Sequence, residues 1–339
     1  MKSVSESSSS PSPIFVVGSP RSGTTLLYHM LVSTGLFLDY RAETHFFDLF
    51  LPRYGDPSGR RRRERLADAW LASTYHVRTG IDRSPIRKRL LEEGTSPGRF
   101  LSLIMSEAAL RQSRPRWADC TPAHVLYMDA IKREIPSALF LHVVRDGRDV
   151  ALSLAPRGWV RPLPWDRKDP VLVAAWAWQR LVEVGRRLGS DLGPAYREVA
   201  FEDLVRSPGP TLDGLSDFVG VPLGLEQIGR SPVGSVLRPN TTFADAPDQF
   251  DPVERWRTRM EQRDLQRIEA TVGSTLLACG YRLQTSGRST IGLDARYRVA
   301  RLRSGAQAVL RDRTPLGRLL ADPGGAAPPD SLPEERTAG

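Results

Sequence analysis

The sequence predicts an α/β protein whose central parallel sheet is covered by helices on both faces, and three observations lead to this prediction. The short β-branched and aromatic run Ile14–Val17 ends in a glycine-bounded turn, Gly18–Gly23, after which helical spacing begins at Thr24. The run 138–144 is apolar apart from His142, as is typical of parallel strands that are buried on both faces. Strand and helix patterns then alternate, which indicates a doubly wound sheet with ligands at the carboxyl ends of its strands.

The other elements follow from apolar periodicity and from residues that begin or end helices. The first strand, loop and helix together are expected to extend to about Leu38. Pro136 ends a helix, and Gly280 closes the last long one. The expected helices begin at Arg60 or run over residues 97–111, 125–135, 212–219 and 253–277, and another begins at Asp149. The further expected strands lie at residues 116–122 and 196–201.

The glycine turn has the spacing of the phosphate-binding P-loop. Gly18 and Gly23 match the two glycines of G-x-x-x-x-G-K-[ST], and Thr25 takes the Ser/Thr place. Such a turn lays successive backbone N–H groups around a phosphate. Thr24 stands where nucleoside triphosphatases carry the lysine that reaches the β- and γ-phosphates, whereas Arg21 brings a cation into the loop itself. We therefore expect the loop to bind a doubly anionic group other than a triphosphate.

The segment Pro20–Thr25 resembles the 5′-phosphosulfate loop of the sulfotransferases, which take a sulfuryl group from 3′-phosphoadenylyl sulfate (PAPS). Its arginine is similar to that of the tyrosylprotein sulfotransferases and their bacterial relatives. The resemblance implies a P-loop-type three-layer α/β/α fold with a central parallel sheet, PAPS as the donor substrate and no metal. It also implies that the donor is bound by Arg21, Ser22, Gly23, Thr24 and Thr25.

A second segment, Val143–Ser153, resembles the part of the sulfotransferases that binds the 3′-phosphate of PAPS. In that family an arginine and a serine eight residues later hold the phosphate, and Arg145 and Ser153 have this spacing. Two weaker similarities follow. Phe201 stands where the family has a tyrosine near the adenine, and Arg255 lies in a late basic segment that closes over the nucleotide. The two main segments together fit a nucleotide with phosphates at its 5′ and 3′ ends.

Transfer to a hydroxyl group needs a base for the acceptor proton and groups that stabilise charge on the sulfuryl and leaving oxygens. The segment Glu43–Asp48 resembles the glutamate-x-histidine-phenylalanine-phenylalanine-aspartate segment of the glycan sulfotransferases, whose glutamate is the base. The resemblance implies that Glu43 is the catalytic base and that Arg21 stabilises charge, with His45 as the alternative base. Cys120 departs from the family, because many relatives have a lysine at this position.

Composition predicts a globular, cytoplasmic protein. The two cysteines, Cys120 and Cys279, are far apart in the 339-residue chain and fit a reducing compartment. The polar N-terminus has no apolar core of a signal peptide, and no apolar stretch is long enough for a membrane helix. We expect a disordered tail at residues 1–13, a sulfotransferase domain at 14–285, a basic extension of helical character at 286–322 and a disordered tail at 323–339.

The net charge of +9 favours anionic partners. The expected partner is a hydroxyl-bearing acceptor, either a glycan, a lipid, a phenol or a peptide tyrosine, and no nucleic acid. The basic extension either packs on its own domain or contacts an anionic membrane surface. Two other functions stay open. A P-loop kinase or NTPase conflicts with Thr24 at the lysine position, and a non-catalytic binder of anionic surfaces leaves the two phosphate segments unexplained.

Overall fold

The structure, a computed structural model, describes residues 12–160, 164–224, 251–286 and 290–313. The two predicted tails lie outside these ranges, except for residues 12 and 13. The described chain forms two compact units. Unit 1 contains the residues up to Arg145 and those of Arg180–Val253, and unit 2 contains Asp146–Gln179 and the residues from Glu254 onwards. The predicted domain at 14–285 includes parts of both units, and its limits stay a prediction.

Unit 1 is built around a four-stranded parallel sheet with the strand order β2-β1-β3-β4. β1 pairs with β3 over its whole length, from Ile14 opposite Leu139 to Gly18 opposite Val143. Every residue of β1 is buried, as expected for a central parallel strand. The predicted strands are confirmed, although the one expected at 116–122 is much shorter. The strands are β1 Ile14–Gly18, β2 Ala118–Asp119, β3 Leu139–Val144 and β4 Tyr196–Ala200.

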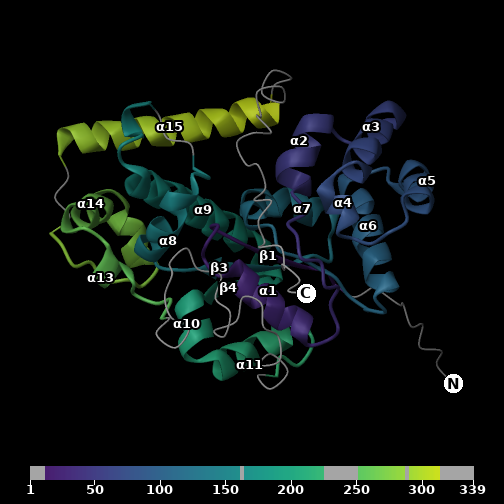
Figure 1. Cartoon of the computed structure of the whole chain (residues 1–339), viewed down its shortest axis with the longest axis horizontal. Helices are drawn as coiled ribbons and strands as arrows, with labels where there is room; N and C mark the ends of the chain where they lie inside the picture. The colour runs from purple at the N-terminus through teal and green to yellow at the C-terminus, as the bar shows by residue number, and fades with distance from the viewer. Residues whose placement is uncertain (1–11, 161–163, 225–250, 287–289, 314–339) are drawn as a thin grey trace, which may run out of the picture. The chain divides into compact units, whose positions relative to one another are not determined.

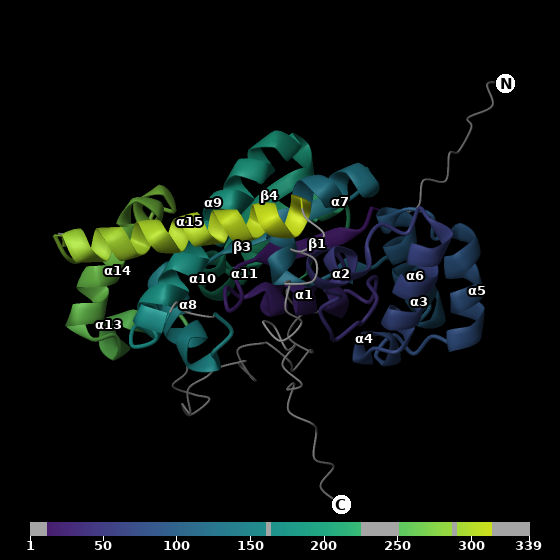
Figure 2. The same cartoon turned by 90° about the horizontal axis from the view of Figure 1, so that it is seen from above.

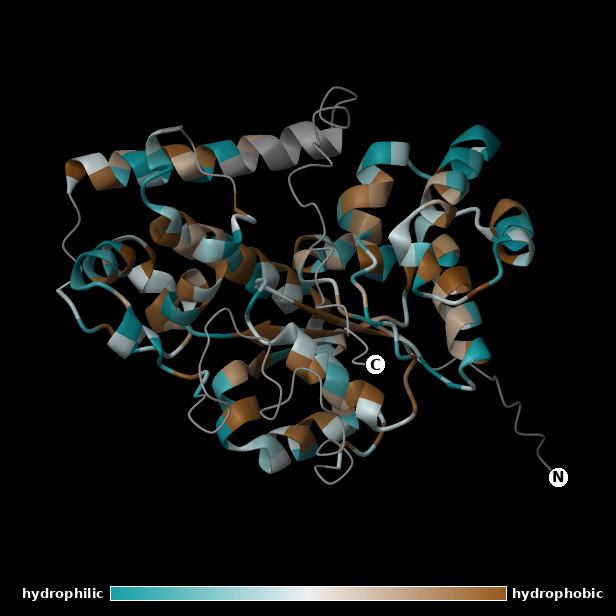
Figure 3. Cartoon of the chain, viewed as in Figure 1, coloured by the Kyte–Doolittle hydropathy of each residue, from teal (hydrophilic) through white to brown (hydrophobic). Residues whose placement is uncertain are grey.

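Side chains of β1 alternate between two hydrophobic cores, one on each face of the sheet. Ile14 and Val16 belong to one core, and Phe15 and Val17 belong to the other. The first core is shared with α1 Thr24–Ser33, α10 Phe201–Arg206 and α11 Pro208–Val219, which lie together below the strands in Figure 1. The second core is shared with α6 Pro97–Arg111, α7 Met128–Glu134 and the unit 1 part of α9 Pro170–Leu192. This arrangement is the predicted three-layer α/β/α fold, and Figure 3 shows its strands as hydrophobic.

A group of short helices lies beside α6 in unit 1 (Figures 1 and 2). α6 has the predicted limits, because Ser96 caps its first turn by accepting from the Arg99 N–H and Pro97 fits the first helical position. α3 begins at Arg60 as predicted, and its arginine run faces solvent while Leu66 and Trp70 are buried. The group also contains η1 Phe46–Phe50, α2 Leu51–Tyr54, α3 Arg60–Leu71, α4 Thr74–Val77 and α5 Arg83–Glu93.

Two helix predictions were wrong in detail. The helix expected at 125–135 begins as a 3₁₀ helix, η2 Pro122–Tyr127, before α7. The long helix expected at 253–277 is two helices of unit 2, α13 Trp256–Arg259 and α14 Gln262–Ala278. Met260 and Glu261 between them have extended backbone angles, which a helix cannot continue through.

Candidate active site

The glycine turn between β1 and α1 needs glycine at both of its ends. A Cβ atom at Gly18 would lie 2.5 Å from the carbonyl oxygen of Val143 on the neighbouring strand. A Cβ atom at Gly23, whose φ is +97°, would lie 2.2 Å from the ring of Phe201. Arg21 also has a positive φ of 71°. The turn is therefore a tight one, with glycine required at the two positions that give the sequence its P-loop spacing.

The turn can bind an anion with hydroxyl and backbone groups. Ser22 is only 1% exposed, and within the described structure its Oγ has no hydrogen-bond partner. Thr24 is buried at the first position of α1, and Thr25 and Arg21 are partly exposed. The N–H groups in the first turn of an α-helix have no partners within the helix and carry partial positive charge. A buried hydroxyl without a partner at such a helix end fits a phosphate or phosphosulfate group.

Arg145 lies directly against this turn. Its Nη1 donates to the carbonyl oxygen of Arg21 at 3.0 Å, Nη2 donates to that of Pro252, and the guanidinium lies 4.4 Å from the ring centroid of Phe201. The structure thus brings the two predicted phosphate segments together at Arg145. Ser153 is a buried residue of α8 Gly147–Leu154 in unit 2, so its pairing with Arg145 stays a prediction. Arg255, in unit 2, is the N-cap of α13.

Glu43 lies on a turn just before η1, with its side chain 42% exposed. Its Oε2 is 3.0 Å from Nε2 of His45, and Nδ1 of His45 is 2.9 Å from Oδ2 of Asp48. His45 has a positive φ of 47°, which turns its ring back between the two carboxylates. The backbone of the turn is also held, because the Thr44 N–H donates to Oγ1 of Thr121 at 2.8 Å. The carboxylate of Glu43 is therefore accessible to a ligand and oriented by His45.

A buried continuation of this contact chain was missed by the sequence reasoning. Nε2 of His124 is 3.3 Å from Oδ1 of Asp48, and its Nδ1 is 2.7 Å from Oδ2 of Asp119. Asp119, at the end of β2, and His124, in η2, are both fully buried. They are more than 70 residues from Glu43. They come close to it because residues 36–38 pair with Arg116, just before β2, while β2 pairs with β1. The only sequence signal was Asp48, the last residue of the segment that resembles the glycan sulfotransferases.

The carboxylates determine the charge of both histidines. Burial disfavours a charged imidazole at His45, but Asp48 and Glu43 outweigh burial and raise the pKa of His45 to about 11. Burial opposes charge at His124 too, and Asp119 and Asp48 raise its pKa to about 9. Burial would raise the pKa of Asp48, but the two imidazoles hold it far below its usual range. A protonated His45 has no lone pair for an acceptor proton, which favours Glu43 over His45 as the base.

The glycine turn and Glu43 both influence the pKa of one buried thiol, that of Cys120. Burial raises the pKa of Cys120 well above its usual value, the charges of Glu43 and Asp119 raise it further, and a hydrogen bond with the Thr24 side chain opposes them. Cys120 is therefore a neutral thiol, which cannot supply the positive charge of a lysine. It lies between the two contacts that relate the halves of the predicted site, because β2 pairs with β1 ahead of the turn and Thr121 binds the backbone N–H of Thr44.

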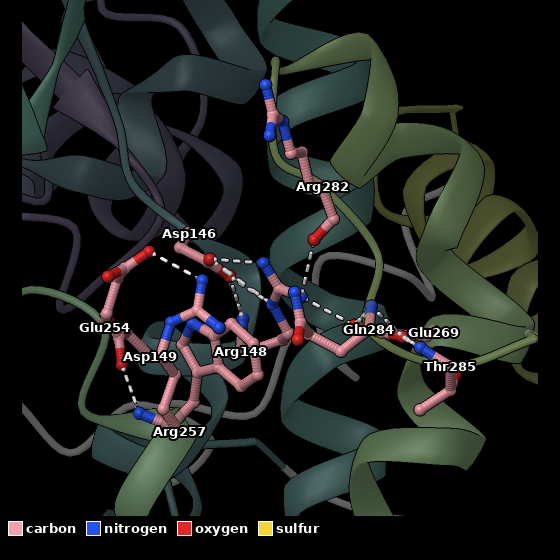
Figure 4. A network of polar contacts seen from close by, with 10 residues as sticks. Asp146, Arg148, Asp149, Glu254, Arg257, Glu269, Arg282, Gln284 and Thr285 are labelled. Carbon is pink, nitrogen blue, oxygen red and sulfur yellow. Dashed lines mark hydrogen bonds and ion pairs between the residues drawn. The ribbon is translucent and has the colours of Figure 1, made fainter.

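A kinase or NTPase needs an aspartate near the end of a strand to hold Mg²⁺, and Asp146 lies two residues beyond β3. In unit 2 its carboxylate accepts from the backbone N–H of Arg148 at 2.9 Å and from Nη2 of Arg148 at 2.7 Å (Figure 4). Nη1 of Arg148 also reaches Glu269 at 2.6 Å, and its guanidinium stacks 3.7 Å from the ring centroid of Trp256. Asp146 thus caps α8 and binds a buried arginine. Among the described residues no group of three or more His, Cys, Asp and Glu could hold a metal ion.

None of the described helices is long and apolar enough to cross a membrane. A comparison with curated proteins returned no match. The sulfotransferase domain from the curacin biosynthetic pathway shares 20% identity at a TM-score of 0.51, over 80% of this chain and 99% of that domain. The sulfotransferase domain from the Synechococcus PCC 7002 olefin synthase shares 22% identity at a TM-score of 0.47, over 80% and 98%. Sulfotransferase STF9 from Mycobacterium avium shares 16% identity at a TM-score of 0.45, over 81% and 79%.

The likeness to the curacin-pathway domain agrees with the α/β/α fold described above. Membership of a family is shown by a different comparison. A family model described as "Sulfotransferase family" matches residues 13–224, which include β1, the glycine turn, the Glu43 turn and all four strands. The chain therefore belongs to the sulfotransferase family.

Proposed function

We propose that this sulfotransferase moves a sulfuryl group from PAPS to a hydroxyl acceptor, with Glu43 as the general base and Arg21 as the stabiliser of charge. The observation that supports this most is that the turn and Glu43 are both fixed to β2. β2 pairs with β1, which leads directly into the glycine turn, and Thr121, two residues beyond β2, accepts the N–H of Thr44 beside Glu43 at 2.8 Å. A carboxylate and a turn that can bind the phosphosulfate group are thus held by the same short strand, which suits direct transfer between two bound substrates.

In this proposal the 5′-phosphosulfate of PAPS binds at the turn, through the N–H groups that begin α1, the buried Ser22 hydroxyl, Thr24 and Thr25. Gly23 allows the close approach, because a side chain there would meet Phe201. Arg145, beside the turn, and Ser153 bind the 3′-phosphate by the spacing of their segment. Arg145 would then exchange its contacts with backbone carbonyls for charge-assisted bonds to the phosphate.

Transfer then follows from the position of Glu43. The carboxylate takes the proton of the acceptor hydroxyl while the acceptor oxygen attacks sulfur on the side opposite the bridging oxygen of PAPS. A new oxygen–sulfur bond forms, the bond from sulfur to the bridging oxygen breaks, and 3′,5′-adenosine bisphosphate (PAP) leaves. Arg21 and the N–H groups of the turn stabilise the negative charge that grows on the leaving oxygen. With a neutral thiol at Cys120, Arg21 is the cation that serves this role in the turn.

The proposal is tested by calorimetric titration of the full chain with PAP, beside ADP and ATP with and without Mg²⁺. We expect PAP to bind at micromolar Kd, about 8 kcal/mol of binding free energy, and ADP and ATP to bind much more weakly. Such a preference requires a site for the 3′-phosphate, which ADP and ATP lack. Preference for ATP with Mg²⁺ would contradict the proposal and would indicate a kinase or NTPase. A screen of glycans, lipids, phenols and tyrosine peptides with PAPS then identifies the acceptor. The two cysteines, which lie far apart in the sequence, fit a cytoplasmic location.

The basic extension contributes a second surface to the proposal. Within the predicted extension the structure has the helix α15 Ile291–Arg313. One side of α15 is fixed within unit 2, because Leu293 is buried, Arg296 binds Asp166 at 2.6 Å and Tyr297 donates to Gln179. On the opposite side of the helix the described side chains are exposed. Figure 3 shows hydrophobic and hydrophilic residues alternating along its described part.

The outer side of α15 combines apolar and basic side chains. Ile291 is 91% exposed and Leu302 is 73% exposed, and at 100° per residue the two lie on one stripe with Arg298. Val299 and Arg301 flank this stripe and are also exposed. Apolar side chains between arginines on a helix suit the surface of an anionic bilayer, where the apolar groups enter the headgroup region and the arginines meet lipid phosphates. We propose that this side of α15 binds such a surface.

Co-sedimentation with vesicles tests the surface of α15. We expect the chain to bind phosphatidylglycerol vesicles but not phosphatidylcholine vesicles, and the Ile291→Glu/Leu302→Glu variant to bind about tenfold or more weakly. Leu110→Glu is the matched control, since Leu110 is a 70% exposed leucine of α6 in unit 1. Equal loss of binding in the control, or none in the α15 variant, would contradict this part of the proposal while leaving the donor site untouched.

A further inference from the structure

Asp119, at the end of β2, is the centre of a buried polar cluster whose members all lead to the Glu43 turn. Its Oδ2 is 2.7 Å from Nδ1 of His124 and accepts from the Thr44 hydroxyl at 3.0 Å. Its Oδ1 accepts from the Thr121 hydroxyl at 2.8 Å. The side chain is fully buried, and each of its oxygens has a partner within the cluster. Asp119 thus fixes a histidine and two threonines at once.

Two routes connect Asp119 with Glu43. The first runs along the backbone, where Thr121 accepts the Thr44 N–H and Asp119 accepts the Thr44 hydroxyl, so that the residue next to Glu43 is held on both sides. The second runs through side chains, from His124 to Asp48, from Asp48 to His45 and from His45 to Glu43. Each contact in this second route is between 2.7 and 3.3 Å long. Carboxylates and imidazoles alternate along it, so every group faces a partner of opposite polarity.

A cluster of this kind is a costly way to stabilise a core. Burying ionised groups carries a large desolvation cost, and well-packed apolar side chains of similar volume are often as stable or more so. Apolar packing is available at this place, because the rings of Phe15 and Phe47 already lie against His124. What the ionic chain provides and an apolar core cannot is direction. Each carboxylate lies at ion-pair distance from an imidazole, and the last imidazole, that of His45, is 3.0 Å from the partly exposed carboxylate of Glu43.

We infer that Asp119 and His124 are positioning residues that orient the Glu43 carboxylate for proton transfer. This inference rests on the proposed role of Glu43 as the base. His124 holds Asp48 so that its second oxygen faces His45, and His45 in turn keeps a proton on Nε2 toward Glu43. Without His124, Asp48 loses one of its two fixed partners, and the side chain of Glu43 gains rotational freedom. A base displaced by about 1 Å can lose about 100-fold in rate.

The inference is tested first by a measurement that needs no activity. The chain has five histidines, so selective ¹⁵N labelling of their imidazoles gives few signals. The groups that face His45 are Glu43, Asp48 and the ring of Tyr75. Those that face His124 are Asp119, Asp48, the Phe47 N–H and the rings of Phe15 and Phe47. In the otherwise unchanged chain, Glu43→Gln is expected to shift the Nε2 signal of His45.

The critical comparison repeats Glu43→Gln in a His124→Gln background. We expect the shift at His45 to shrink to less than about half, because the orientation of His45 toward Glu43 is no longer fixed. His142→Gln is the matched control. His142 is also a fully buried histidine of unit 1, but it contacts Tyr196 on β4, so its loss should lower Tm and leave the His45 shift intact. An undiminished shift in the His124→Gln background overturns the inference.

Asp119→Asn is the second variant, for the case that His124→Gln does not fold, and it keeps the shape while removing the charge. In an assay with PAPS and an acceptor from the screen, we expect kcat to fall at least about tenfold, with PAP affinity and the KM for PAPS unchanged. An unchanged kcat overturns the inference. If the unsubstituted chain binds no PAP and transfers no sulfuryl group, the proposed function fails. The histidine signals then still decide whether Asp119 and His124 orient Glu43.

Discussion

Replacing Glu43 with glutamine is expected to lower kcat for PAPS-dependent transfer by about 10²–10⁴-fold, the usual contribution of a positioned general base. Glutamine keeps the length of the side chain and can still contact Nε2 of His45, which is 3.0 Å from Glu43. It cannot accept the proton of the acceptor hydroxyl. Because Glu43 removes a proton only as transfer proceeds, the loss should appear in kcat and not in donor binding. Calorimetry should therefore give the same Kd for PAP before and after the substitution.

The control for Glu43→Gln is Glu64→Gln on α3. Glu64 is a partly exposed glutamate that pairs with an arginine, Arg60 at 3.0 Å, and lies outside the polar cluster. We expect its substitution to leave kcat and PAP affinity unchanged. If Glu43→Gln retains full activity, Glu43 is not the base. If it loses PAP binding together with activity, the carboxylate supports the donor site and its assignment as the base must be abandoned.

His45 gives a second check on this assignment, since the resemblance left it as the alternative base. The structure gives His45 two carboxylate partners, and they raise its pKa to about 11. It therefore stays protonated at neutral pH and acts on transfer only through Glu43. A histidine used as the base would need to be neutral before transfer. The electrostatics thus separate two residues that the sequence segment presents side by side.

Local patterns were sufficient to predict the strand, the glycine turn and the helix at residues 14–33. β1, the glycines and α1 follow one another without interruption, so the spacing from Gly18 to Gly23 already contains the geometry that the structure shows. Arg145 was also predictable, because it directly follows a buried strand and parallel strands end at the same edge of a sheet. Both predictions depend on contacts between neighbouring elements of regular type, for which periodicity is informative.

The polar cluster could not be predicted in the same way. Asp119 and His124 reach Asp48 and Thr44 because β2 pairs with β1 and residues 36–38 pair with Arg116, and such pairings between distant segments have no local signal. His124 also lies in a 3₁₀ helix that begins before the helix expected at 125–135, so its direction was not readable. The division into two units likewise has no local signal in the sequence. α9 is one continuous helix that contributes to both, and nothing in its sequence marks the passage at Arg180.

Replacing Gly23 with alanine is expected to abolish donor binding, with a loss of PAP affinity of about 10³-fold, or about 4 kcal/mol. Two effects combine here. A φ of +97° is strained for any residue with a Cβ, and the new methyl group would lie 2.2 Å from Phe201. Phe201 is buried and lies under the guanidinium of Arg145, so its ring cannot move aside without displacing the turn. Calorimetry with PAP and thermal unfolding measure the two consequences.

Gly80→Ala separates the strain from the contact. Gly80 has a similar positive φ of +67°, but no atom within 4 Å of where a Cβ would lie. Gly80→Ala should lower the free energy of unfolding only by the conformational strain, about 1–2 kcal/mol, and leave PAP binding intact. In a Phe201→Ala background, the loss of unfolding free energy that Gly23→Ala causes should fall toward this value, because the clash is gone. If Gly23→Ala binds PAP as tightly as Gly80→Ala does, the donor does not approach the backbone at this turn. The phosphosulfate group would then have to bind elsewhere in the chain.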